Sequence, residues 1–78
     1  MSDLGFILRD LLERRDPHGY YVIPVDADKF PLVRRYLPQG SKLLHAGDII
    51  LVKTRSRSHA ERLARAASRL GALALEEL

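Results

Sequence analysis

Four consecutive apolar residues, Ile49-Ile50-Leu51-Val52, limit the folds open to this chain more than any other stretch. A strand that is apolar at every position must have both faces covered, so it lies at the centre of a sheet. We predict this strand over residues 48–54. A helix predicted over residues 58–70 follows it closely, and the remaining elements are arranged around this pair.

The predicted helix carries both a start signal and a stop signal. Ser58 and Glu61 have capping-box spacing, in which the Ser58 hydroxyl accepts from the backbone N–H of Glu61 and the carboxylate reaches back. Gly71 is a typical residue just after a helix end. One face of the helix is apolar at helical spacing. Its members are Ala60, Leu63, Ala64, Ala67 and Leu70.

Further strands, predicted from short apolar runs, and one further helix lie along the chain. These are strands 20–25, 41–45 and 72–75 and helix 28–37. Residues 16–19 have type I turn chemistry ahead of the first strand, with Asp, Pro and Gly at the favoured positions. Pro24 cannot donate to a ladder, so we expect it at a strand end or on an unpaired side.

The predicted order is β-α-β-β-α-β over residues 19–76, after an N-terminal helix within residues 1–16. This is the α+β, ferredoxin-like split βαβ sandwich (βαββαβ) as a single domain over residues 1–78, with strand order 4-1-3-2 and both helices on one sheet face. The N-terminal helix, capped by Ser2, is expected to cover the sheet or to contact a partner. The predicted core is Ile23, Val25, Val33, Ile50, Val52, Leu63, Ala67 and Leu70.

Composition limits the compartment. The chain has no cysteine, and no apolar run approaches the ~20 residues of a membrane span. Its start, Met1-Ser2-Asp3, lacks the basic residues of a signal peptide. We therefore expect a cytoplasmic protein with no membrane partner. Ten arginines against three lysines, with no asparagine, indicate either a heat-adapted, thermostable protein or a GC-rich source.

Charge is distributed unevenly along the chain. Residues 1–28 are net −3, residues 29–69 hold ten bases and two acids for a net +8, and the overall charge is +3. A strongly basic middle segment points to an anionic partner and says little about the fold.

The candidate site is the run Lys53-Thr54-Arg55-Ser56-Arg57, predicted as a loop ahead of the capped helix. Free backbone N–H groups at a helix start attract anions, and arginine binds phosphate bidentately. The alternative is a solvated loop whose serines only cap the helix. Other bases could extend the patch. These are Arg34, Arg35, Lys42, Arg62, Arg65 and Arg69.

Aromatic and titratable residues give weaker patterns. Tyr20 and Tyr21 lie on a predicted strand as the base-stacking aromatics of RNA-recognition domains do, but the apolar strand 48–54 has no aromatic, so core tyrosines are favoured. The three histidines have no metal-site spacing. The Asp26/Asp28 pair could hold a divalent cation, but helix capping explains both aspartates. The residues in question are His18, His45, His59, Asp26 and Asp28.

The first hypothesis is a small basic RNA-binding protein, for example a ribosome or other ribonucleoprotein component, that contacts phosphates and needs no cofactor. No nucleophile has a base in a recognisable pattern, so we do not predict an enzyme. The second hypothesis is a protein-interaction or homo-oligomerisation module that uses the N-terminal helix and the sheet face. A third is a regulatory domain that binds a small anion. The predicted RNA contacts are Lys53, Arg55, Arg57, Arg62, Arg34 and Arg35.

Overall fold

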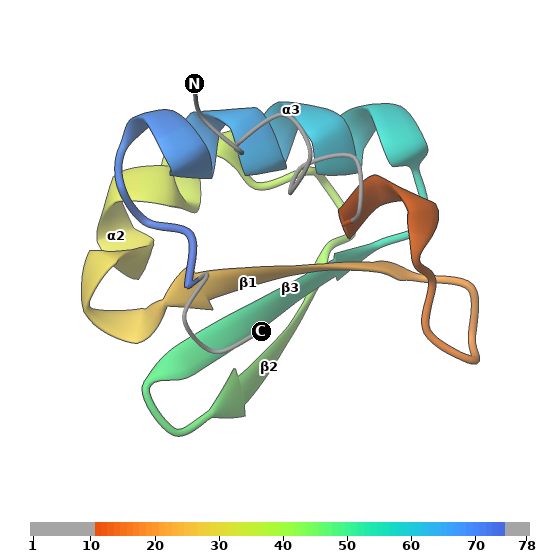
Figure 1. The fold of residues 1–78 in the computed structure, drawn as a ribbon, viewed down its shortest axis with the longest axis horizontal. Coiled ribbons are helices and arrows are strands. Elements are labelled where there is room, and N and C mark those ends of the chain that lie inside the picture. The colour runs from red at the N-terminus through yellow and green to blue at the C-terminus, as the bar shows by residue number, and fades with distance from the viewer. Residues whose placement is uncertain (1–10, 75–78) are drawn as a thin grey trace.

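The computed structural model describes residues 11–74, which form a small α+β fold with one antiparallel sheet (Figure 1). Its strands are β1 (Tyr21–Asp26), β2 (Lys42–Ala46) and β3 (Ile49–Thr54), in the order β1-β3-β2. Both neighbours pair with β3 in antiparallel register. The central place predicted for the apolar strand is therefore confirmed.

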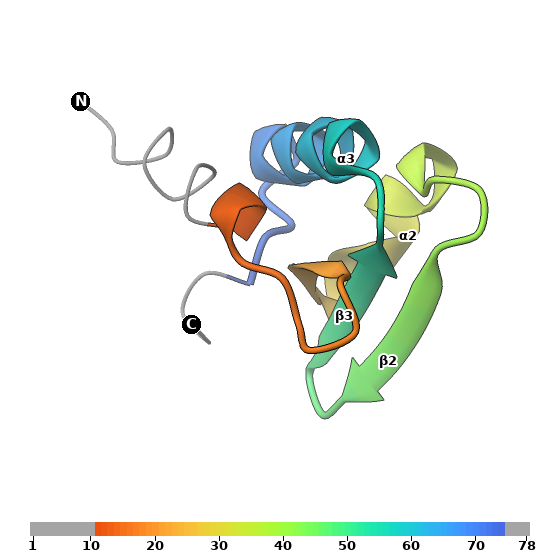
Figure 2. The ribbon, with the colours of Figure 1, turned by 90° about the vertical axis from the view of Figure 1, so that its right-hand side faces the viewer.

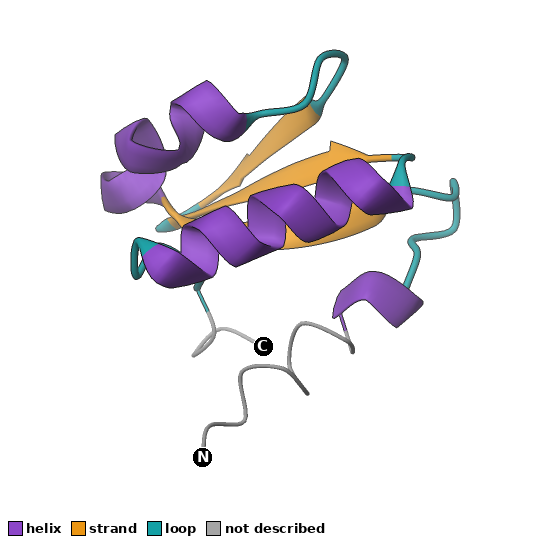
Figure 3. Ribbon diagram, turned by 90° about the horizontal axis from the view of Figure 1, so that it is seen from above, coloured by secondary structure: helices purple, strands orange, loops and turns teal. Residues whose placement is uncertain are grey.

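The helices lie on one face of the sheet (Figures 1 and 3). Helix α3 (Arg57–Arg69) runs across it beside a shorter helical segment that links β1 to β2. That segment is not the single helix predicted over 28–37. It is divided into η1 (Ala27–Lys29), α2 (Phe30–Val33) and η2 (Arg34–Tyr36). Asp26 makes no side-chain capping bond there, and Pro31 supplies no backbone N–H, so regular α-helical bonding does not extend through the segment.

The fourth predicted strand is reduced to one β-bridge between Val25 and Leu73. Asp26 donates to the Ala72 carbonyl at 2.8 Å, and Ala74 donates to the Pro24 carbonyl at 3.1 Å. Pro24 therefore lies inside β1 and faces a side that is paired, so the predicted strand-end or unpaired position is wrong. Its carbonyl accepts a bond there, and its missing N–H limits how far a ladder can grow. The described sheet has three strands, so the complete ferredoxin-like pattern is not observed.

The start of α3 differs from the prediction by its cap. Ser56, not Ser58, is the N-cap, and its hydroxyl accepts from the backbone N–H of His59 at 3.3 Å. The Ser58 hydroxyl instead lies 3.1 Å from that of Ser56. Glu61 makes an i,i+4 ion pair with Arg65 at 2.9 Å rather than a capping box.

The core lies between the sheet and α3, with Leu63 fully buried. The predicted core is correct except for Leu70, which is 39% exposed because it forms the C-cap just after the last turn of α3. Leu11 and Leu12, in a helical turn at residues 11–13, are also buried. The rest of the predicted N-terminal helix, including Ser2, lies outside the described residues.

No helix in residues 11–74 has the length and apolar character needed to cross a membrane.

Candidate functional site

One face of the sheet is not covered by any helix of the described chain (Figure 2). Side chains alternate between the two faces of a strand, so Val22 and Pro24 on β1 and Leu51 on β3 point to this face, where Pro24 is buried and the other two are half-buried. Pro24 pairs with Leu51, and Leu51 pairs with Leu44, so these three form an apolar row across the strands. Leu44, on the edge strand β2, is 50% exposed.

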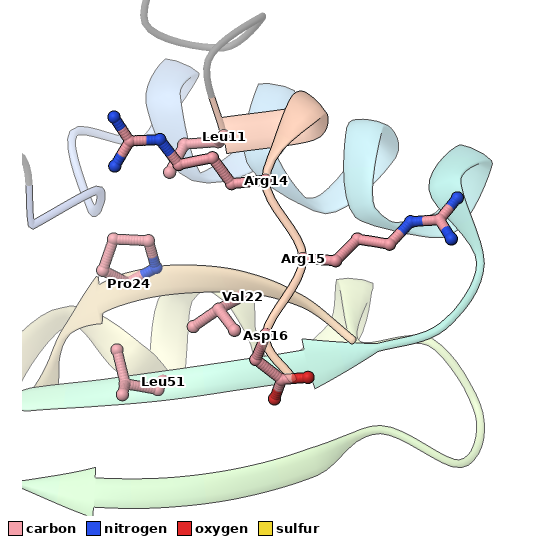
Figure 4. Close-up of a pocket in the computed structure, with 7 residues that line it drawn as sticks. All are labelled: Leu11, Arg14, Arg15, Asp16, Val22, Pro24 and Leu51. Atoms are coloured by element: carbon pink, nitrogen blue, oxygen red, sulfur yellow. The ribbon is translucent and has the colours of Figure 1, made fainter. Parts of the chain in front are cut away.

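Residues 11–16 approach the open face from the β1 side and leave a cavity of about 250 Å³ (Figure 4). The cavity is bounded by apolar side chains of the sheet below and by the turn that leads into β1. Its lining residues are Leu11, Arg14, Arg15, Asp16, Val22, Pro24 and Leu51.

Two cations lie over one aromatic ring at the end of this face, and a third cation, Lys53, lies beside one of them. The Arg55 guanidinium carbon lies 4.6 Å and the Lys42 Nζ lies 5.3 Å from the centroid of the Tyr20 ring. Lys42 is also the register partner of Lys53 on β3. Both contacts to Tyr20 are within cation–π range. We call Tyr20, Lys42, Lys53 and Arg55 the sheet-end cluster.

Asp16 links this cluster to the turn before β1. One carboxylate oxygen accepts from the backbone N–H groups of His18 and Tyr20, each at 2.9 Å, and the other lies 3.2 Å from Lys53 Nζ. Gly19, with φ 87°, closes the predicted turn by donating to the Asp16 carbonyl. The two neighbouring lysines of the cluster therefore have one carboxylate to offset their repulsion.

The same contacts lower the pKa of the Asp16 carboxyl below its usual value. The largest cause is the hydrogen bond from the backbone N–H of Tyr20, and Lys53 and the N–H of His18 act in the same direction, while burial opposes them. Each of these groups favours the charged carboxylate.

Replacing Asp16 with asparagine is expected to lower Tm at neutral pH by an amount that disappears in acid. A carboxyl whose pKa is lower in the folded state stabilises the protein above its unfolded pKa, about 4, and this stabilisation is lost as pH falls through the folded value. Asparagine keeps the acceptor oxygen but not the charge. Melting curves of wild type and Asp16→Asn from about pH 2 to pH 7 would check this. A Tm difference that stays constant over that range would contradict the expectation.

The structure divides the predicted site residues among different places. The run 53–57 is not a loop, because Lys53 and Thr54 end β3 and Arg57 begins α3, leaving only Arg55 and Ser56 between them. Lys53 and Arg55 belong to the sheet-end cluster. Arg57 instead borders a hollow on the helix side of the sheet. The other residues of that hollow are Leu12, Glu13, Arg15 and Tyr21.

Arg35 and Arg62 meet in a separate hollow of about 380 Å³ between η2 and α3. His59 and Tyr36 also line it, and the Arg35 guanidinium carbon lies 5.8 Å from the Tyr36 ring centroid. Arg34 is exposed on η2 and does not line this hollow. The basic residues of the middle segment therefore do not converge on one face.

The two adjacent tyrosines have different environments. Tyr21 is buried on the helix side, and its hydroxyl accepts from Arg15 at 2.8 Å, in agreement with a core role. Tyr20, one position earlier, is half-buried in the sheet-end cluster. Sequence reasoning assigned both tyrosines to the core and missed the contact of Lys42 with Tyr20. Strand alternation combined with the β2–β3 register is the signal that could have found it.

Among residues 11–74, no group of three histidine, cysteine, aspartate or glutamate side chains is placed to hold a metal ion. Comparison with protein-family models, curated proteins and solved structures gives no significant match for this chain.

Proposed function

We propose that this protein binds single-stranded RNA on the open face of the sheet, with the sheet-end cluster as the main contact. The supporting observation is a half-buried tyrosine ring with two cations over it, Arg55 and Lys42, beside an apolar sheet surface. Bases stack on aromatic rings, and lysine and arginine contact the phosphates. Such a site binds RNA by charge and stacking and needs no catalytic group.

Each member of the cluster has a defined role in this proposal. Arg55 and Lys42 supply cations to phosphates, while Tyr20 offers its ring to a base. Lys53 keeps Asp16 as its ion partner and adds positive potential. The apolar side chains of Leu51 and Leu44 extend the surface on which a second base can lie.

The remaining predicted contacts define a second, separate region. Arg35 and Arg62 are proposed to hold a further phosphate in their hollow, with Arg34 beside it on η2. Arg57 borders the helix-side hollow and adds to the positive potential near the start of α3. These residues have weaker support than the sheet-end cluster, because one cation, Arg35, lies over the Tyr36 ring, whereas two lie over the Tyr20 ring.

We also propose that the fold is a ferredoxin-like one whose fourth strand is short. The sheet order β1-β3-β2 and the helices on one face support this assignment. The bridge between Val25 and Leu73 adds the expected neighbour on the outer side of β1.

Removing two cluster cations is expected to make RNA binding less salt-dependent. Each lost phosphate contact reduces the slope of log K against log salt by about 0.7 for a single strand. The experiment is a salt titration of affinity for a labelled oligouridylate, comparing wild type with the Arg55→Ala, Lys42→Ala double variant. Exposed charges of this kind contribute little to folding, so Tm should change little.

The matched control removes the same charge from the outer surface of α3. Arg65→Ala with Arg69→Ala takes away two exposed arginines outside the cluster and should leave the slope near that of wild type. Equal slopes for both double variants would show that only total charge matters. Absence of RNA affinity in wild type at low salt would refute the proposed function.

A further inference from the structure

Strand β2 is exposed along its whole length. All five residues from Lys42 to Ala46 are exposed, and Leu43 and Leu44 have 42% and 50% of their surface accessible. β2 is also an edge strand, and no other strand of the described chain pairs with its outer side. A strand edge with free N–H and C=O groups is a template for pairing with another strand.

The backbone groups that point outward can be assigned from the ladder. Pro24 and Asp26 bond to the 72–74 segment, so the alternate residues of β1 bond to β3. Because this alternation continues across β3, the backbone groups of Leu44 point toward β3 and bond to Leu51. The N–H and C=O groups of Leu43 and His45 therefore point away from the sheet.

We propose that two copies of this chain associate by antiparallel pairing of their β2 strands about a two-fold axis at Leu44. In this register Leu43 of one copy faces His45 of the second copy, and the two such pairs form roughly four backbone hydrogen bonds. Leu44 faces Leu44 of the second copy across a non-hydrogen-bonded position, where side chains are closest. An interface of this kind is self-complementary, as a two-fold dimer requires.

Side-chain pairing favours this register over its neighbours. An axis at Leu43 would place each Leu44 opposite Lys42 of the second copy, so the contact between the two Leu44 side chains would be lost. With the axis at Leu44, Lys42 faces the uncharged Ala46 of the second copy. An axis at Lys42 would place two lysines directly opposite each other, which is unfavourable. An axis at His45 would place two histidines opposite each other and leave Lys42 without a facing residue in β2 of the second copy.

The dimer joins the two open sheet faces. The apolar row Pro24, Leu51 and Leu44 continues into the second copy, which buries the exposed Leu44 side chains against each other. The two Lys42 positions lie about 14 Å apart along the strand direction, four residues at ~3.4 Å each. The association rests on β2 alone and does not depend on whether the protein binds RNA.

The first test is the mass of the full chain in solution without RNA, measured by sedimentation equilibrium over a range of concentrations. Wild type should shift from monomer to dimer, and Leu44→Lys should weaken the dimer at least tenfold because it places two lysines in contact. Leu32, 51% exposed on α2, gives the matched control. Leu32→Lys should dimerise as wild type does, and all three proteins should have the same circular dichroism spectrum.

The second test traps the register. The chain has no cysteine, so Leu44→Cys introduces the only thiol. Residues at a non-hydrogen-bonded antiparallel position have Cα atoms about 4.5 Å apart, within the range for a disulfide. Mild oxidation should give a disulfide-linked dimer faster for Leu44→Cys than for Leu32→Cys. A wild type that stays monomeric, a Leu44→Lys dimer as tight as wild type, or equal crosslinking rates would overturn the proposal.

Discussion

Replacing Leu63 with alanine is expected to lower the free energy of unfolding by about 2–5 kcal/mol. Leu63 lies in the middle of α3 and is fully buried against the sheet, so its removal leaves a cavity as well as losing apolar contact. For a domain of this size each kcal/mol corresponds to ~4–8 °C in Tm. Denaturant unfolding followed by circular dichroism would measure the change.

Leu70→Ala provides the control in the same helix. Helical spacing places Leu70 on the same stripe as Leu63, but it is the C-cap of α3 and 39% exposed. Its replacement should cost much less than that of Leu63, within about 1 kcal/mol. Equal losses at the two positions would mean that the end of α3 is packed as tightly as its middle, contrary to the structure.

The contrast between these two leucines shows what periodicity can predict. The stripe on α3 correctly identified Leu63 and Ala67 as core residues because they lie where the helix crosses the sheet. Periodicity contains no information on where that crossing ends. Leu70 lies just past the last helical turn. It therefore fits the helical pattern, but the prediction that its side chain is buried was wrong.

Local sequence signals could not predict which of two serines caps α3, because the tertiary structure decides between them. Both Ser56 and Ser58 are good N-cap residues, and the choice depends on where β3 stops. Thr54 ends β3, and its hydroxyl accepts from the Ser56 N–H at 3.3 Å, which fixes the chain just before the helix. The N-cap of α3 therefore lies two residues before the predicted one.

The positive charge of the candidate site could be predicted from the sequence, but the spatial arrangement of its residues could not. Counting bases along the chain located the positive segment 29–69, yet it could not tell which bases share a face. The sheet-end cluster requires the β2–β3 register, which places Lys42 beside Lys53. That register depends on a tight turn with Gly47 at φ 66°, a detail that composition does not reveal.

Replacing Tyr20 with alanine is expected to weaken RNA binding by about 1–3 kcal/mol, roughly 5- to 150-fold, if a base stacks on its ring. The ring is half-buried and holds Arg55 and Lys42 close to it, so its loss also removes the group that positions both cations. Affinity for the labelled oligouridylate at constant salt is the measurement. Tyr20→Phe keeps the ring and should retain most of the affinity.

Tyr36→Ala separates this site from the hollow that contains Arg35 and Arg62. Tyr36 is 37% exposed and is the aromatic residue of that hollow, so its loss removes a comparable ring from the competing region. Stacking at the sheet-end cluster predicts a much larger loss of affinity for Tyr20→Ala than for Tyr36→Ala. The reverse order would move the main RNA contact to the hollow between η2 and α3, because the phosphate-binding arginines there would then act with Tyr36.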